Sequence, residues 1–335
     1  VVAFATSGVF GADGSTAKGA LYVRDGATLS FAPTSAAKKA ADLNYRVLHL
    51  AGAGKDNRGA AEFTANVYDT DNDTARRIVL DADTKVGMKS GSLTFIATDY
   101  IDLNGFVLSF GGSGTFTVRG QVKGEGEVVL PTTSVEFGVR TGTVVASETD
   151  PFVFKSGKFA IIEYTTRPVN RPAWICGTGN QINFSDYWNT GKWQLSTNYC
   201  TWAGPIVFTN ETGVAELSVS GNAAKHQLSF TGPITGKGKV TVASGNVSRI
   251  YFAGRGCTYT GGFVMAGGKV AVRYPDSLPD YSTVSATAGH IDVIFDPADP
   301  DCWTMTDFAK LANEATWSNN TFPAMDISAY DDIPV

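Results

Sequence analysis

The chain has 335 residues, of which 18% are charged, and it carries 37 glycines and a net charge of −5. An average soluble domain is about 25% charged, and this low-charge, glycine-rich balance suits strands and tight turns better than helices. The 27 basic and 32 acidic residues are interspersed, without the basic stripe expected of a protein that binds phosphates, so nucleic acid is not an expected partner.

The first segment in chain order, residues 1–45, is expected to be an N-terminal segment or cap. It begins at Val1 without a methionine or a signal peptide, which suggests a processed product or a fragment of a longer chain. Its Ala/Lys-rich stretch at residues 34–43 suits a short helix or a loop. No run of about 18 apolar residues occurs anywhere in the chain, so no transmembrane helix is expected.

Residues 46–295 are dominated by apolar residues that alternate with polar ones, in short runs that end at Gly, Asn or Asp. This pattern predicts many short strands, each with one buried face. The runs begin about 10–13 residues apart, which a sandwich, a barrel or a solenoid allows. They include Leu93/Phe95, Ile101/Leu103, Phe106/Leu108/Phe110, Phe116/Val118, Val128/Leu130, Ile206/Phe208, Leu217/Val219, Leu228/Phe230, Val240/Val242, Ile250/Phe252, Val270/Val272 and Ile291/Val293/Phe295.

Internal repetition favours the solenoid. Residues 120–130 match residues 232–242 at their glycines and at their apolar positions. A second match joins Cys200–Phe208 with Cys257–Met265. Repeated units of strand and glycine are typical of solenoids, because one rung cannot bury its inward face alone and must stack on its neighbours. The predicted fold is therefore all-β, a parallel β-helix or β-solenoid.

The repeats also resemble a known family. The runs Ile234–Val242, Ile250–Gly254, Tyr259–Val272 and Ser277–Pro279 are similar to the autotransporter-associated β-strand repeat, and Leu50–Ala60 and Ile101–Leu108 resemble further rungs of such proteins. The resemblance covers about residues 45–280. It implies a right-handed β-helix in a secreted or bacterial cell-surface protein. The family turn usually has Asn where this chain has Gly256 and Cys257, so Cys257 inherits no role.

An aromatic-rich insertion is predicted at residues 163–204. Flat aromatic rings can stack on sugars or peptides, so this insertion is the candidate ligand surface. The alternative is that the same rings pack against one another as a small satellite core. The candidate binding residues are Trp174, Tyr187, Trp188, Trp193 and Trp202.

The tail, residues 296–335, is expected to be a C-terminal cap or the start of a continuing region. Between Thr304 and Ala315, helical spacing places Met305, Phe308, Leu311 and Ala312 on one face. This pattern predicts a short helix that closes the end of the stack, because an open rung leaves its backbone pairing groups exposed.

Metal and thiol chemistry is weakly indicated. Asp69, Asp71 and Asp73 alternate and are a candidate calcium site, although Thr74 and Leu80 occupy the positions where an EF-hand needs Gly and Glu. A solvated acidic loop is the alternative, and the turn with Asp296, Asp299 and Asp301 is a weaker candidate of the same kind. The four cysteines show no zinc-ligand spacing, and they allow either two disulfides or buried free thiols: Cys176, Cys200, Cys257 and Cys302.

No catalytic constellation and no cofactor motif stand out. His49, His226 and His290 are isolated and are expected to be surface or partly packed residues. The expected function is a non-catalytic structural or adhesive β-solenoid that presents loops at the cell surface to glycans, proteins or copies of itself. The alternatives are a carbohydrate-active β-helix enzyme, with carboxylates brought together from separate rungs, and a subunit of a self-assembling surface filament.

Overall fold

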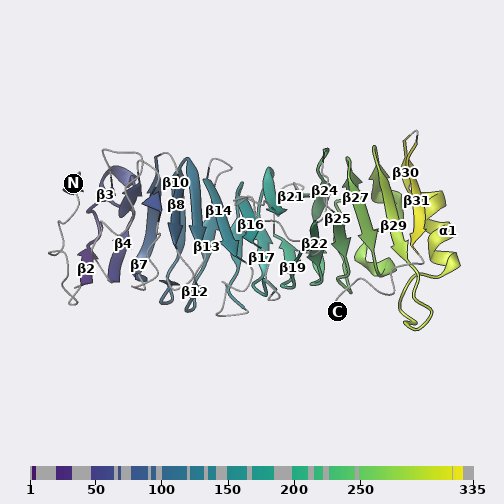
Figure 1. The fold of residues 1–335 in the computed structure, drawn as a ribbon, viewed down its shortest axis with the longest axis horizontal. Helices are drawn as coiled ribbons and strands as arrows, with labels where there is room; N and C mark the ends of the chain where they lie inside the picture. The colour runs from purple at the N-terminus through teal and green to yellow at the C-terminus, as the bar shows by residue number, and fades with distance from the viewer. Residues whose placement is uncertain are drawn as a thin grey trace. The chain divides into compact units, whose positions relative to one another are not determined.

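The computed structural model describes residues 2–4, 20–31, 47–63, 67–68, 77–89, 92–95, 100–118, 121–131, 135–140, 149–163, 168–184, 198–209, 215–221, 226–245, 249–318 and 320–326. The chain divides into two compact units, Val1–Ala160 and Ile161–Val335. Both units consist mainly of short strands that pair in parallel with strands from the preceding and following turns of the chain (Figure 1). The fold is a β-solenoid, which confirms the predicted class, while the hand of the coil stays a prediction.

The N-terminal unit contains three rows of parallel strands. One row runs through β1 (Val2–Phe4), β3 (Leu29–Phe31), β5 (Ala61–Phe63), β7 (Arg77–Met88), β10 (Leu108–Gly112), β13 (Val128–Leu130) and β15 (Phe152–Phe154). A second row branches from the same sheet and runs through β2 (Ala20–Val23), β4 (Val47–Gly52), β7, β9 (Tyr100–Asp102) and β12 (Gln121–Lys123). The third row comprises β6 (Val67–Tyr68), β8 (Ser92–Phe95), β11 (Gly114–Val118) and β14 (Val135–Arg140).

The C-terminal unit is also built from three rows, and β16 (Lys158–Glu163) crosses the boundary between the units. The first row has β17 (Ala173–Ile175), β20 (Ile206–Phe208) and β23 (Ile234–Gly236). The second has β18 (Asn180–Phe184), β21 (Ala215–Gly221), β24 (Gly238–Val242), β26 (Phe263–Met265), β28 (Val284–Ala286) and β30 (Thr316–Trp317). The third has β19 (Asn198–Trp202), β22 (His226–Phe230), β25 (Arg249–Phe252), β27 (Lys269–Val272), β29 (His290–Ile294) and β31 (Phe322–Asp326).

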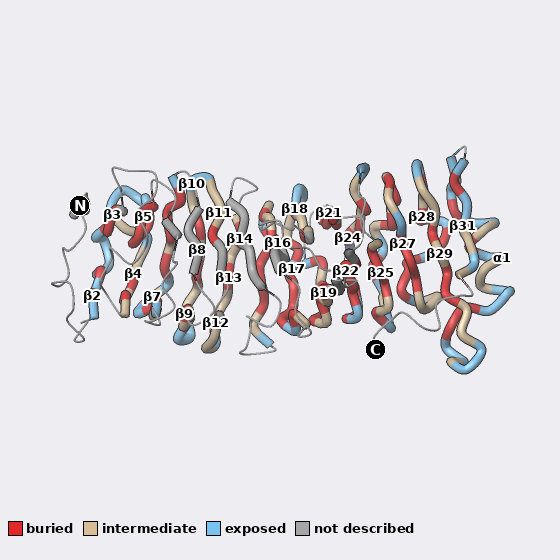
Figure 2. The backbone as a smooth tube through the Cα atoms, in the orientation of Figure 1, coloured by how far each residue is buried: buried red, intermediate tan, exposed pale blue. Residues whose placement is uncertain are grey.

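The core consists of apolar ladders in which equivalent residues of successive turns lie side by side. In the third row of the C-terminal unit one such ladder is fully buried and passes through Cys200, Leu228, Ile250, Val270 and Ile291. Inward residues of a parallel stack line up because parallel pairing keeps the register of each strand. Exposed residues concentrate at the turns between strands (Figure 2). The alternation in the sequence therefore marks the inward face of each rung.

The glycines of the internal repeat hold equivalent turns. Gly124 and Gly236 both adopt positive φ, 79° and 93°, a conformation that favours glycine. At Gly236 a Cβ atom would overlap the backbone oxygen of Phe208 in the preceding rung. These glycines are part of the internal repeat in the sequence. The structure explains why glycine recurs there: the backbones of adjacent rungs approach too closely for a side chain.

The predicted C-terminal helix is present as α1 (Met305–Glu314), and it packs against β31 and the short 3₁₀ helix η4 (Tyr281–Thr283). Thr304 caps it: the Thr304 hydroxyl accepts a hydrogen bond from the backbone of Asp307, whose carboxylate bonds back to Thr304. Leu311 is fully buried, but Met305 is 60% exposed. Of the four residues on the predicted apolar face, Leu311 is thus the buried one, Phe308 and Ala312 are partly buried, and Met305 lies at the exposed end.

Strand β31 is the last described rung. It pairs with β29 on one edge, and no described strand pairs with its other edge. Pro323 stands within it, and proline lacks the N–H that a further strand would need.

The expected segments at 1–45, 46–295 and 296–335 stay predictions, and residues 34–43 lie outside the described part of the chain. Within the predicted insertion at 163–204, the described strands β17, β18 and β19 pair in register with other rungs. Among the described helices, none is long and apolar enough to cross a membrane.

Replacing Gly236 by alanine should destabilise the fold more than replacing Gly245. Both glycines have positive φ, which costs an alanine about 1–2 kcal/mol, but a Cβ at Gly245 meets nothing within 4 Å, whereas one at Gly236 meets Phe208. Urea unfolding of both variants measures the difference. Equal losses of unfolding free energy would contradict the role assigned to the close approach of the rungs.

Candidate ligand-binding face

The N-terminal unit carries aromatic and charged side chains on the outer face of the row β2–β4–β7–β9–β12. The inward residues of this row form a fully or almost fully buried ladder, whose members are Leu48, Ile78, Ile101 and Val122. Because successive side chains of a strand point to opposite faces, the residues beside them point outward. Two outward rows result: Ala20, Val47, Arg77 and Tyr100, and Tyr22, His49, Val79, Asp102 and Lys123.

The first part of this face is a stack of two rings. The rings of Tyr22 and His49 lie 4.3 Å apart and almost parallel, at 17°. The guanidinium of Arg24 lies over the Tyr22 ring at 5.6 Å, and the Nδ1 atom of His49 lies 2.9 Å from the carboxylate of Asp81. Tyr22 is 52% exposed, so this stack reaches the surface while its partners hold it in place.

The second part is a ring between two cations. Strand β9 lies between β7 and β12, and the Tyr100 ring is approached by Arg77 from β7, at 5.1 Å, and by the Lys123 ammonium from β12, at 3.7 Å. Such contacts are worth about 0.5–1 kcal/mol each at exposed sites. They also restrict long side chains that would otherwise be mobile. We call the six residues Tyr22, Arg24, His49, Arg77, Tyr100 and Lys123 the aromatic–cation ladder.

The charges of this ladder are only partly neutralised. Lys123 lies 3.8 Å from Asp102, but neither Arg24 nor Arg77 makes an ion pair with any residue that the structure describes. The exposed parts of the face therefore offer guanidinium donors and aromatic edges. This chemistry suits the binding of a polar or anionic ligand.

The predicted aromatic surface is not assembled by the described residues. Trp174 is 39% exposed in β17, whereas Trp202 in β19 is completely buried and offers no face to solvent. Tyr187, Trp188 and Trp193 lie outside the described residues, as do Asp69, Asp71 and Asp73 of the candidate calcium site.

The weaker acidic candidate near the C-terminus is engaged by an arginine. Ligand atoms of Asp296, Asp299 and Cys302 lie within 4.8 Å of one another. However, the guanidinium of Arg273 donates to both carboxylates, at 3.2 and 3.1 Å. The arginine supplies the positive charge that balances this turn, and the arrangement fastens residues 296–302 to the end of β27.

The four cysteines are free thiols. The sequence allowed two disulfides or buried free thiols. Cys200 and Cys302 are buried free thiols, and Cys176 and Cys257 are partly buried free thiols. Burial raises the pKa of the Cys200 thiol and raises that of Cys257 to about 11, so both are protonated at neutral pH and are poor nucleophiles.

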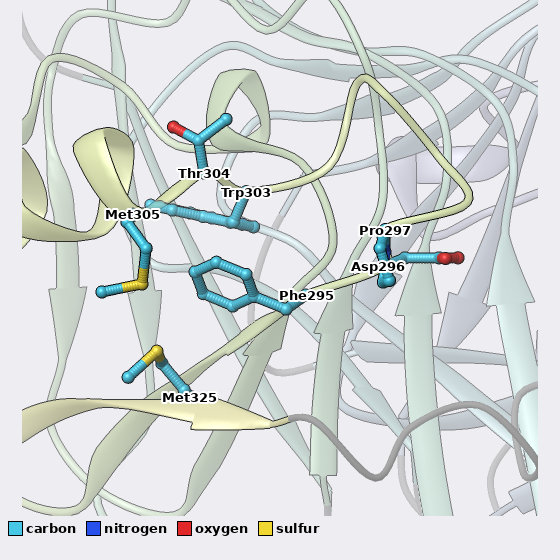
Figure 3. Close-up of a pocket in the computed structure, with 7 residues that line it drawn as sticks. All are labelled: Phe295, Asp296, Pro297, Trp303, Thr304, Met305 and Met325. Atoms are coloured by element: carbon cyan, nitrogen blue, oxygen red, sulfur yellow. The ribbon is translucent and has the colours of Figure 1, made fainter.

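An apolar cleft of about 580 Å³ lies beside α1. Figure 3 shows Phe295, Trp303, Met305 and Met325 gathered around it, with the carboxylate of Asp296 directed away. The indole N–H of Trp303 is used internally, since it donates to the backbone oxygen of Val272. The cleft has no convergent set of polar groups that would support a reaction.

The outer face of the last rungs carries a second charged group, which is largely compensated. Arg249 of β25 donates to Asp326 of β31 at 3.0 Å, and His290 Nε2 lies 3.4 Å from Asp292. Burial raises the pKa of the Asp292 carboxyl, against the opposing effects of His290 and Arg249. Beside these charges, Tyr251, Ala271 and Ile294 form a buried apolar cluster. This face therefore offers fewer uncompensated charges to a ligand than the aromatic–cation ladder does.

Sequence reasoning missed the aromatic–cation ladder. The sequence predicts an isolated His49, whereas in the structure its ring stacks on Tyr22 and bonds to Asp81. A signal was present: in these short runs outward residues alternate with apolar inward ones. The runs are Ala20–Val23, Val47–Leu50, Arg77–Leu80, Tyr100–Leu103 and Gln121–Lys123.

The substitution Asp292→Asn should stabilise the protein at neutral pH. A carboxyl whose pKa is raised by folding favours the folded state when it is protonated, and this contribution is lost as pH rises through its folded pKa. The unfolding free energy of the parent protein should therefore fall relative to that of the variant as pH increases.

Asp280→Asn is the matched control of opposite sign, because hydrogen bonds from Ser282 lower the pKa of Asp280. For this pair, the unfolding free energy of the parent protein should rise relative to that of the variant as pH rises above the folded pKa of Asp280. Urea unfolding between acid and neutral pH tests both, and the same sign for the two variants would refute the assignment.

Comparison with known proteins gave no identification: no family model matches the chain, and neither the curated proteins nor the solved structures gave a significant match.

Proposed function

We propose that this chain is a non-catalytic, extracellular β-solenoid with a structural or adhesive role at a bacterial surface, and that the aromatic–cation ladder is its ligand-binding face. The observation that carries the proposal is the ladder itself. It places two tyrosine rings and three cations on one outer face, and Tyr22 and Arg77 are exposed to solvent. Aromatic and arginine side chains are the groups most enriched where proteins bind partners.

The architecture supports the same proposal. A β-solenoid presents a rigid, repeating surface, and residues of successive rungs line up on it. The resemblance of the rungs to the autotransporter-associated β-strand repeat supports secretion to the cell surface. A non-catalytic role agrees with the thiols that burial keeps protonated and with the arginine bound between the carboxylates of Asp296 and Asp299.

A glycan and polysaccharide array, scored for both binding and cleavage, tests the proposal. The purified chain should bind at least one array member without releasing sugar fragments. The double variant Tyr22→Ala/Tyr100→Ala should bind about tenfold more weakly, because the lost ring contacts and cation–ring contacts together contribute about 1–2 kcal/mol.

Trp174→Ala is the control, since Trp174 is an exposed aromatic residue of the C-terminal unit. Circular dichroism and thermal unfolding establish that each variant is folded. Loss of binding in Trp174→Ala but not in the tyrosine variant would move the binding surface to the C-terminal unit. Cleavage that persists through purification and disappears when one carboxylate is changed would refute the non-catalytic proposal.

A further inference from the structure

We infer that the ligand of the aromatic–cation ladder is an extended acidic polysaccharide that lies along the direction in which the strands stack; this inference rests on the function proposed above. Its basis is the spacing and ordering of three cations, Arg24, Arg77 and Lys123, and the availability of the two arginines.

The cations recur on alternate strands. Arg24 directly follows β2, Arg77 opens β7 and Lys123 ends β12, while β4 and β9 lie between them in the order β2–β4–β7–β9–β12. Neighbouring strands are about 4.8 Å apart, so the strands that carry the cations lie about 10 Å apart along the stack. A polymer that follows the stack therefore meets positive charge at regular, widely separated points.

The cations are also held in place before a ligand arrives. Each lies over a tyrosine ring, Arg24 over Tyr22 and both Arg77 and Lys123 over Tyr100. Fixing a long side chain on binding costs conformational entropy, and part of this cost is already met in the free protein. The ring contacts therefore increase the affinity that each cation can give.

Among the described residues, acidic neighbours leave the charges of Arg24 and Arg77 uncompensated, whereas Lys123 has one acidic partner. Asp81 is engaged by His49, and Asp102 lies 3.8 Å from Lys123, while Arg24 and Arg77 make no ion pair among the described residues. A ligand carboxylate or sulfate could accept hydrogen bonds from a guanidinium without displacing a protein carboxylate.

The spacing selects the class of polymer. A nucleic acid strand carries one charge per 3.4 Å, far denser than cations on strands about 10 Å apart, and the chain's net charge of −5 opposes a dense polyanion. A polysaccharide with a carboxylate on alternate sugars has a sparser charge, and its sugar rings can contact the exposed ring of Tyr22. We therefore expect selection for sparse negative charge on a sugar chain.

Binding of four defined polymers to the full chain tests the inference. They are hyaluronan, with a carboxylate on alternate sugars; polygalacturonate, with one on each sugar; neutral dextran; and single-stranded poly(dT). Hyaluronan should bind more tightly than dextran and poly(dT), and its affinity should fall as salt is raised. Polygalacturonate should also bind more tightly than dextran.

Arg77→Gln and Lys123→Gln should each weaken hyaluronan binding about fivefold to tenfold, because each removes a charged hydrogen-bond donor from an exposed site. Lys310→Gln, which removes the same charge from the exposed helix α1, should leave binding unchanged. Thermal unfolding establishes that the three variants are equally folded.

The outcomes separate the two proposals. If dextran binds as tightly as hyaluronan and only the tyrosine changes weaken it, the acidic ligand is refuted while the adhesive face stands. Tighter binding of poly(dT) would point to nucleic acid and refute the inference. Equal losses of hyaluronan affinity in Arg77→Gln and Lys310→Gln would show a general charge effect and would also refute the inference. If neither these polymers nor any array glycan binds, both proposals fall.

Discussion

In-register parallel stacking is the constraint on which the rest of this protein depends. A single short strand cannot remove its inward side chain from water, but a ladder such as Leu228, Ile250 and Val270 shares one buried column over successive turns. Parallel pairing fixes which residues meet, so every rung must place an apolar residue at the same position. The glycines at the turns follow from the same constraint, because the rungs approach one another at the distance that backbone pairing sets.

The same register produces the outer surface. Residues that point outward also line up, so similar flat groups can stack from turn to turn, as Tyr22 does on His49. The result differs between the two units. In the C-terminal unit the outward groups neutralise one another, as in the pair of Arg249 and Asp326, and cover a buried apolar cluster. In the N-terminal unit, Arg24 and Arg77 stack on rings and keep their charges available.

The fold was predictable because the features that determine it, apolar alternation and repeated glycines, lie within short stretches of the sequence. Alternating residues such as Val240 and Val242 reveal a half-buried strand, and the matching glycines of residues 120–130 and 232–242 reveal repetition. The C-terminal helix was also predictable, from the helical spacing of Met305, Phe308, Leu311 and Ala312, and a capping box of Thr304 and Asp307 begins it. The candidate site was not found, because its contacts join residues of different turns: nothing near His49 in the chain indicates that Tyr22 will stack on it. Trp202 shows the converse error, since an aromatic-rich composition does not tell which rings point inward.

Strand β31 has a consequence for how the protein behaves in a concentrated environment. An open strand edge is a template on which another chain can add, and this growth is the first step of fibre formation. Pro323 removes one donor from this strand, and α1 packs against it. At this edge of the described stack, both features disfavour the addition of a strand from another molecule, in a fold whose every rung could otherwise pair with one.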